Sequence, residues 1–214
     1  MPTFNSSLLA MDALGEYTWK SMTVRESPSA KTYLEYAQVD FAAGKSNREL
    51  INAISNEKRA MHLRLEDLCL GFGSVDLLRL KNFPSLIGYV QKCGIVAPSI
   101  LTQMNDLRND VEHRYDIPTT DDVKTFLGVT TLFLVATDRW IERQPVEADY
   151  FQKVSDGGET FVLVRLEFVW ERGLVRLHFR KEGEGRGSHT QTVDHKSWSD
   201  EYFRYVHFVL SNNY

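Results

Sequence analysis

The chain has 214 residues, of which 43% are hydrophobic and 25% are charged, and its formal net charge is −4. This balance is typical of a globular protein and excludes a disordered, collagen-like or coiled-coil chain. The negative net charge argues against a protein that coats nucleic acid through bulk positive charge. It leaves room for a local basic cleft.

Several features predict a soluble cytoplasmic protein that needs no metal or cofactor. Cys69 and Cys93 belong to no Cys-x-x-Cys or Cys/His cluster, so we expect reduced thiols that pack as small apolar groups. Residues 1–19 contain Asp12 and Glu16 and lack the basic start of a signal peptide. The longest apolar run, residues 126–136, is too short to cross a bilayer.

Apolar residues recur at helical spacing up to about residue 145, which predicts a series of helices. Capping residues such as Ser29, Ser46 and Thr119 precede several of them, and the spacing of Ser46 and Glu49 predicts a capping box. The expected helices span residues 6–22, 30–43, 47–70, a short stretch ending at 80, 86–92, 98–117 and 123–142.

After this point the pattern alternates and predicts strands. The acidic, turn-rich residues 145–159 are interpreted as a linker. Residues 160–171 and 174–180 predict a hairpin that turns at Arg172 and Gly173, residues 189–196 a possible third strand, and residues 200–210 a last helix. We therefore expect an α+β protein with an all-helical domain at residues 1–144. A small antiparallel sheet with a terminal helix would follow at residues 160–214.

The segment that carries chemistry is residues 107–115, which read Leu-Arg-Asn-Asp-Val-Glu-His-Arg-Tyr. On a helix at about 100° per residue, Arg108, Glu112 and Tyr115 lie on nearly one face, and Asn109 shares an adjacent face with His113. Arg108 and His113 would be about 140° apart. They can converge through the length of the arginine, through a loosened last turn, or through a second copy of the helix across a two-fold axis.

An arginine and a histidine can together catalyse RNA cleavage without a metal ion. An imidazole near its natural pKa can take the proton of a ribose 2′-hydroxyl, and a guanidinium can stabilise the charge that develops on the phosphate. Asn109 can orient His113 or donate to the phosphate. The expected product is a 2′,3′-cyclic phosphate, and DNA would be inert because it lacks the 2′-hydroxyl.

The Arg-Asn-x-x-x-His signature within a helical region resembles the higher eukaryotes and prokaryotes nucleotide-binding (HEPN) superfamily over roughly residues 30–142. The resemblance implies a dimeric, metal-independent endoribonuclease of toxin–antitoxin or other defence systems. Arg108, Asn109 and His113 match the motif positions, and Glu112, Arg114 and Tyr115 would add RNA contacts. Tyr115 completes the extended form of toxins paired with nucleotidyltransferase antitoxins, which implies that it is a site of AMPylation. The chain also carries a β-containing tail that those toxins lack.

Each of these residues also has a purely structural interpretation. Arg108 and Glu112 are spaced as a solvated ion pair, His113 can serve as a favourable C-terminal helix residue, and Tyr115 can be an aromatic at the edge of the core. In the tail, Arg176, His178 and Arg180 form either a phosphate-contacting strand face or a solvated one. Two functional alternatives therefore stay open: a HEPN-like module that binds nucleotide, RNA or protein without turnover, and a helical interaction scaffold.

Overall fold

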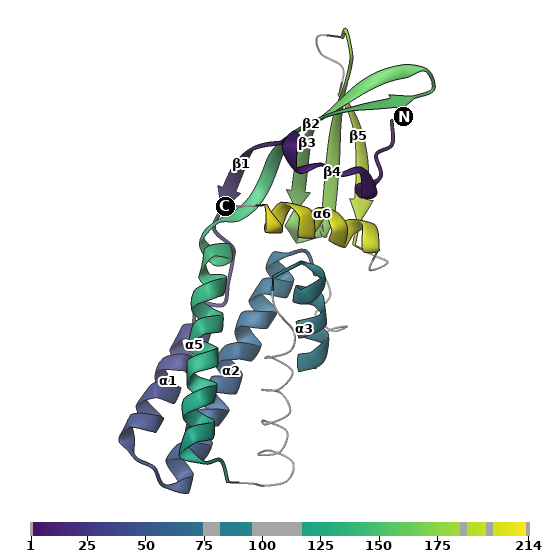
Figure 1. The fold of residues 1–214 in the computed structure, drawn as a ribbon. Coiled ribbons are helices and arrows are strands. Elements are labelled where there is room, and N and C mark those ends of the chain that lie inside the picture. Colours follow the sequence, from purple (N-terminus) through teal and green to yellow (C-terminus); the bar gives the residue numbers. More distant parts are fainter. Residues whose placement is uncertain (1, 75–81, 96–116, 185–187, 196–198, 213–214) are drawn as a thin grey trace.

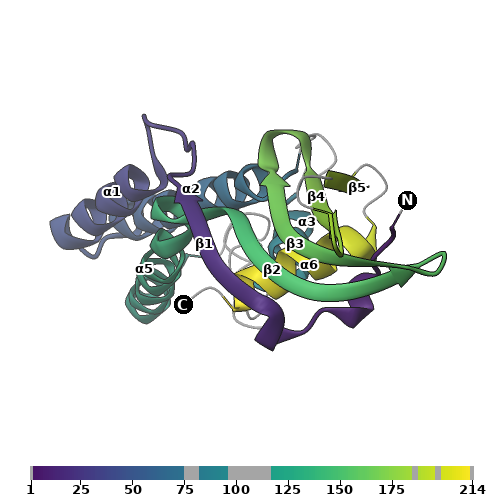
Figure 2. The ribbon, with the colours of Figure 1, turned by 90° about the horizontal axis from the view of Figure 1, so that it is seen from above.

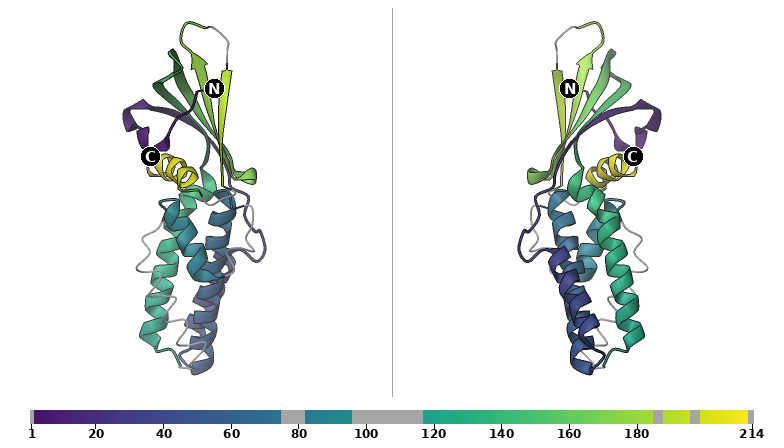
Figure 3. Two further views of the ribbon diagram at one scale, coloured as in Figure 1. Left: turned by 90° about the vertical axis from the view of Figure 1, so that its right-hand side faces the viewer. Right: turned by 90° about the vertical axis from the view of Figure 1, so that its left-hand side faces the viewer.

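The computed structural model describes residues 2–74, 82–95, 117–184, 188–195 and 199–212. The molecule is elongated, with a helix bundle at one end and an antiparallel sheet at the other (Figures 1 and 3). Helix α6 (Asp200–Ser211) lies between the two parts. Among the described residues, no helix combines the length and the apolar character needed to cross a membrane.

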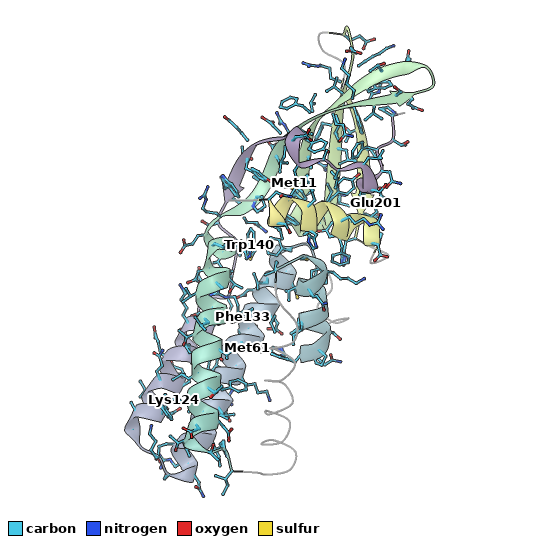
Figure 4. All side chains as sticks on the ribbon, viewed as in Figure 1. Met11, Met61, Lys124, Phe133, Trp140 and Glu201 are labelled. Atoms are coloured by element: carbon cyan, nitrogen blue, oxygen red, sulfur yellow. The ribbon has the colours of Figure 1, made fainter. Side chains whose placement is uncertain are left out.

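The bundle contains α1 (Ala30–Ala43), α2 (Asn47–Gly71), α3 (Phe83–Lys92) and α5 (Thr120–Glu142). Ser29 and Thr119 each begin a helix with a capping box, and the Asn82 side chain caps α3. Leu50 packs in one cluster with Val123, and further along α2 Arg64 contacts Asp138, so α2 and α5 run in the same direction (Figure 1). Met61 of α2 and Phe133 of α5 are both buried between these two ends, in the middle of the bundle (Figure 4).

The sheet is a five-stranded antiparallel meander in the order β1-β2-β3-β4-β5. Figure 2 shows the strands side by side over α6. Buried side chains alternate along the central strands, as in Leu166 and Phe168 of β3. The strands are β1 (Leu14–Lys20), β2 (Gln144–Asp156), β3 (Glu159–Val169), β4 (Leu174–Lys181) and β5 (Ser188–Asp194).

One hydrophobic core continues from the sheet into the bundle. The Phe72 ring at the end of α2 lies 5.3 Å from Trp170 and 6.1 Å from Trp140, measured between ring centroids. The Tyr202 hydroxyl of α6 donates to the Phe72 carbonyl at 3.1 Å, and Tyr205 of the same helix donates to the Phe4 carbonyl at 3.1 Å. Helix α6 therefore joins the two parts by packing and by hydrogen bonds.

The predicted arrangement of an all-helical N-terminal part before a small sheet is wrong in two places. Residues 6–22, expected as a helix, form two 3-10 turns and strand β1, which pairs with β2 in the sheet. Residues Tyr17, Thr18 and Trp19 favour a pleated, half-buried strand, and this preference outweighs the weak helical spacing of the leucines before them.

The second difference concerns residues 145–159: the sequence predicts a linker there, and the structure has most of strand β2. Ala148 and Tyr150 are buried, while Glu147 and Asp149, which alternate with them along the strand, are partly exposed, so the acidic residues lie on one face of a strand. With β1 and β2 included, the sheet has five strands in place of the expected hairpin or three strands.

Other elements are found as expected. The helices predicted at 30–43, 47–70, 123–142 and 200–210 are present within a few residues, and the hairpin predicted at 160–180 is formed by β3 and β4. Cys69 and Cys93 are free and buried, and burial raises the pKa of both thiols. This confirms their role as small apolar groups of the core.

Candidate functional site

All six residues of the predicted ribonuclease motif lie outside the described residues: Arg108, Asn109, Glu112, His113, Arg114 and Tyr115. The described residues that flank them lie at opposite ends of the bundle (Figure 1). On one side, Gly94 packs against His207 of α6. On the other side, Val123 packs with Leu50 near the start of α2.

The basic strand face of the tail is largely neutralised. Glu167 of β3 accepts a hydrogen bond from Arg176 at 2.9 Å, and its other oxygen lies 2.7 Å from Nε2 of His178. Of the three basic residues predicted for this face, only Arg180 has no partner of opposite charge among the described residues. This pairing favours the solvated-face interpretation over a phosphate-contacting sheet.

A buried charged cluster that the sequence did not single out joins α2 to α5. The Arg64 side chain is 5% exposed, and its guanidinium donates to the Leu134 carbonyl at 3.1 Å, to Oγ1 of Thr137 at 2.9 Å and to Oδ1 of Asp138 at 2.9 Å. Lys31 of α1 donates to the other oxygen of Asp138 at 2.8 Å. Three helices thus meet at one carboxylate.

Asp138 is held in its charged form. Burial alone would raise the pKa of its carboxyl, but the hydrogen bonds from Lys31 and Arg64 and their positive charges outweigh burial, so its pKa is lowered. The cluster is therefore a fixed ion-pair network at neutral pH.

Asp67, almost one turn beyond Arg64 on α2, behaves differently. It is 8% exposed, and its Oδ1 accepts a hydrogen bond from the backbone N–H of Arg25 at 3.3 Å. Burial is the largest cause of its shift and raises the pKa of Asp67 to about 6, although the Arg25 N–H and the charge of Arg64 act in the opposite direction. A carboxyl that titrates near this pH can exchange a proton under ordinary conditions.

Asp67, Arg64 and Asp138 line a cavity of about 340 Å³ that lies between residues 24–31, α2 and α5. A volume of this size falls in the range of small-molecule sites. The cavity combines a fixed ion-pair network with the Asp67 carboxyl, whose pKa is raised to about 6. Chemically, it can bind a small polar ligand or move a proton to or from it.

Deeper in the bundle, Glu57 and Thr130 form a second polar position. Glu57 lies one heptad after Leu50 and one heptad before Arg64, and Thr130 lies in the same way between Val123 and Thr137. Because Leu50 packs with Val123 and Arg64 bonds to Thr137, Glu57 and Thr130 occupy the same level of the bundle. Both residues are 0% exposed, and their side-chain oxygens have no hydrogen-bond partner among the residues that the structure describes. Burial raises the pKa of Glu57 to about 9, so it carries a proton at neutral pH.

A signal for these positions is present in the sequence. Glu57, Arg64 and Asp67 interrupt the apolar stripe of the helix predicted at residues 47–70, where hydrophobic residues would be expected. Charged residues on a buried face are uncommon unless they are paired or functional. The identity of their partners on α1 and α5 has no comparable signal, because it depends on how the helices pack.

No family model, curated protein or solved structure shows significant similarity to this chain.

Proposed function

We propose that the protein is a metal-independent endoribonuclease of HEPN type that acts as a homodimer. The observation that carries the proposal is the spacing Arg108-Asn109-x-x-x-His113 in a chain whose neighbouring helices form a bundle. The bundle of α1, α2, α3 and α5 supports it, because the resemblance implies a helical domain for this part of the chain. The negative net charge fits an enzyme that engages RNA locally.

The proposed chemistry uses only groups of the chain. His113 takes the proton of a ribose 2′-hydroxyl, the 2′-oxygen attacks the adjacent phosphorus, and the bond to the 5′-oxygen breaks. The leaving 5′-oxygen receives a proton from the imidazolium of His113 of the partner subunit. Arg108 stabilises the charge that grows on the phosphate oxygens, and Asn109 orients the histidine. The products are a 2′,3′-cyclic phosphate and a free 5′-hydroxyl.

The wider role follows from the same resemblance. We propose a cytoplasmic toxin or defence effector whose RNA contacts include Glu112, Arg114 and Tyr115. Modification of Tyr115 by a nucleotidyltransferase antitoxin would add a bulky, negatively charged group beside the catalytic pair. Such a group would repel the RNA backbone and so neutralise the enzyme.

A second candidate function is binding without turnover. The cavity of about 340 Å³ beside Asp67 favours it, since this cavity is built from described residues of the bundle and does not depend on the motif. In that case the helical part would hold a small polar ligand, and the protein would cleave no RNA.

The test is cleavage of single-stranded RNA by the purified protein in the presence of EDTA. We expect cleavage by the wild-type protein and at least a hundredfold loss in His113→Ala and in Arg108→Ala, the order expected when a general base or a transition-state donor is removed. The matched control is His62→Ala, because His62 is a partly exposed histidine of α2 whose Nε2 lies 3.3 Å from Glu66. Cleavage that needs a divalent metal, or that survives His113→Ala, would reject the mechanism, and RNA binding without cleavage would favour the second candidate.

A further inference from the structure

A groove of about 700 Å³ runs along the outer side of α6. The exposed stripe of the helix, which contains Arg204, His207 and Ser211, forms its base. Residues 6–11 border it on one side and Lys92 at the end of α3 on the other. Figure 4 shows Met11 beside α6 and Glu201 at the start of the helix.

The groove presents apolar surface to solvent. Leu9, Phe203 and Phe208 line it, and Met11 at its edge is 68% exposed. An exposed methionine beside a concave apolar surface is a common feature of ligand sites, because its flexible thioether adapts to different apolar groups.

Two cations, Lys92 and Arg204, line the groove, and the carboxylate of Asp200 lines it as well. Arg204 and His207 have no ion-pair partner in the part of the chain that the structure describes. Lys92 has one, since its Nζ lies 3.4 Å from Asp200, but that carboxylate is 82% exposed and the pair is weak. On a chain with a net charge of −4, this is a local positive site above an apolar floor.

Ser6 is a buried polar residue at the wall of the groove. It is 5% exposed, and no described residue forms a hydrogen bond with its hydroxyl. A buried hydroxyl without a partner costs free energy, so such groups are rare unless a ligand or a bound water completes them.

From these observations we propose that the groove along α6 binds a small amphipathic anion, an acyl chain of medium length that carries a carboxylate or a phosphate. The apolar body would lie on Leu9, Met11 and Phe208. The anionic head would accept hydrogen bonds from Arg204 and Lys92. This proposal is independent of the ribonuclease activity, and neither depends on the other.

The test is isothermal titration calorimetry of the full-length protein with decanoate and, separately, with decyl phosphate. We expect saturable one-to-one binding of at least one of them and a loss of about tenfold or more in affinity in Arg204→Glu, since a hydrogen bond to a charged group contributes this much. Arg180→Glu is the matched control, because Arg180 is an exposed arginine of β4 outside the groove and should leave the affinity unchanged. The relative affinities of the two probes identify the preferred head group.

Two further arms make the test decisive. Decanol has the same chain without the charge, and we expect it to bind at least tenfold more weakly than the anions. Met11→Ala should weaken both anions while leaving the thermal unfolding midpoint within a degree or two, because Met11 is exposed. Absence of saturable binding up to millimolar concentration would overturn the proposal, as would equal binding of decanol or equal losses in Arg204→Glu and Arg180→Glu.

Discussion

Arg64 on α2 and Asp138 on α5 form an ion pair with 2.9 Å between Nη2 and Oδ1, in a position where the arginine side chain is almost fully enclosed. Lys31 on α1 forms a second ion pair with the same carboxylate, through its other oxygen. The pair fixes the relative position of α2 and α5, and with it the cavity beside Asp67.

Arg64→Ala should lower the free energy of unfolding by about 3 kcal/mol, because it removes a buried partner together with the packing of its aliphatic stem. Urea denaturation measures this value. The control is Lys153→Ala, which breaks an exposed pair with Glu182 and should cost less than about 1 kcal/mol. Equal losses in the two variants would show that the Arg64 network contributes little.

Glu57 makes stability depend on pH. Its folded-state pKa is about 9, whereas a free glutamate ionises near 4.5. Between these values the unfolded chain has released the proton and the folded chain still holds it, so the free energy of unfolding falls as pH rises from 4.5 to 9. Glu57→Gln keeps the shape of the side chain without the titration. We expect this variant to be more stable than the wild type at pH 8, and its unfolding curve to depend less on pH across this window. A wild type whose stability does not change with pH there, after correction for other groups, would contradict a buried neutral Glu57.

The titration of Asp67 should also lower the free energy of unfolding as pH rises, over a narrower pH range than that of Glu57. The pKa of Asp67 is about 6 in the folded protein, whereas an aspartate in the unfolded chain has a pKa of 3.8. As pH rises, the unfolded state therefore loses this proton first, and the free energy of unfolding falls between these two pH values. The free energy of unfolding should fall by about 3 kcal/mol in total, because each unit of difference between the two pKa values corresponds to about 1.4 kcal/mol. Asp67→Asn should remove this part of the dependence, and NMR titration of the carboxyl carbon would give the pKa directly. A midpoint below about 4.5 would show that the carboxyl is solvated.

Substitution of Gly173 tests how closely the sheet and the bundle pack where they meet. Its φ is +58°, and a Cβ there would lie 2.6 Å from the Gly73 carbonyl oxygen at the end of α2. Gly157 has φ of +59° with no atom within 4 Å, so it is a control with the same backbone conformation and no clash. Gly157→Ala should cost about 1 kcal/mol for the left-handed backbone. Gly173→Ala should cost at least 1 kcal/mol more, measured by thermal or urea unfolding. Equal costs would mean that the two parts pack less closely here than the structure describes.

The helices could be predicted from the sequence because their signals are local. Ser29 and Thr119 are caps at the starts of α1 and α5, and the apolar spacing within each helix needs no knowledge of its neighbours. Strands β1 and β2 could not be predicted from the sequence, because they depend on contacts between distant parts of the chain. Glu147 and Asp149 are typical of a linker, and only the packed structure shows that Ala148 and Tyr150, which alternate with them, face a core.

The same distinction applies to the cavity. Arg64 and Asp67 stand out in the sequence as charges on an apolar helix face, but Lys31 and Asp138 become their neighbours only when α1 and α5 pack against α2. The ribonuclease motif is the opposite case, since it is read entirely from the spacing of Arg108 and His113 and stays a prediction.

The proposed role of His113 can be tested by cleavage of an RNA that carries one 2′-deoxynucleotide at a mapped cleavage site. If His113 activates the 2′-hydroxyl, the all-ribose RNA is cut in EDTA to a 2′,3′-cyclic phosphate, and the single deoxy substitution abolishes cutting at that position alone. Cutting that continues at the deoxy position, or products that end in a 5′-phosphate, would contradict the account.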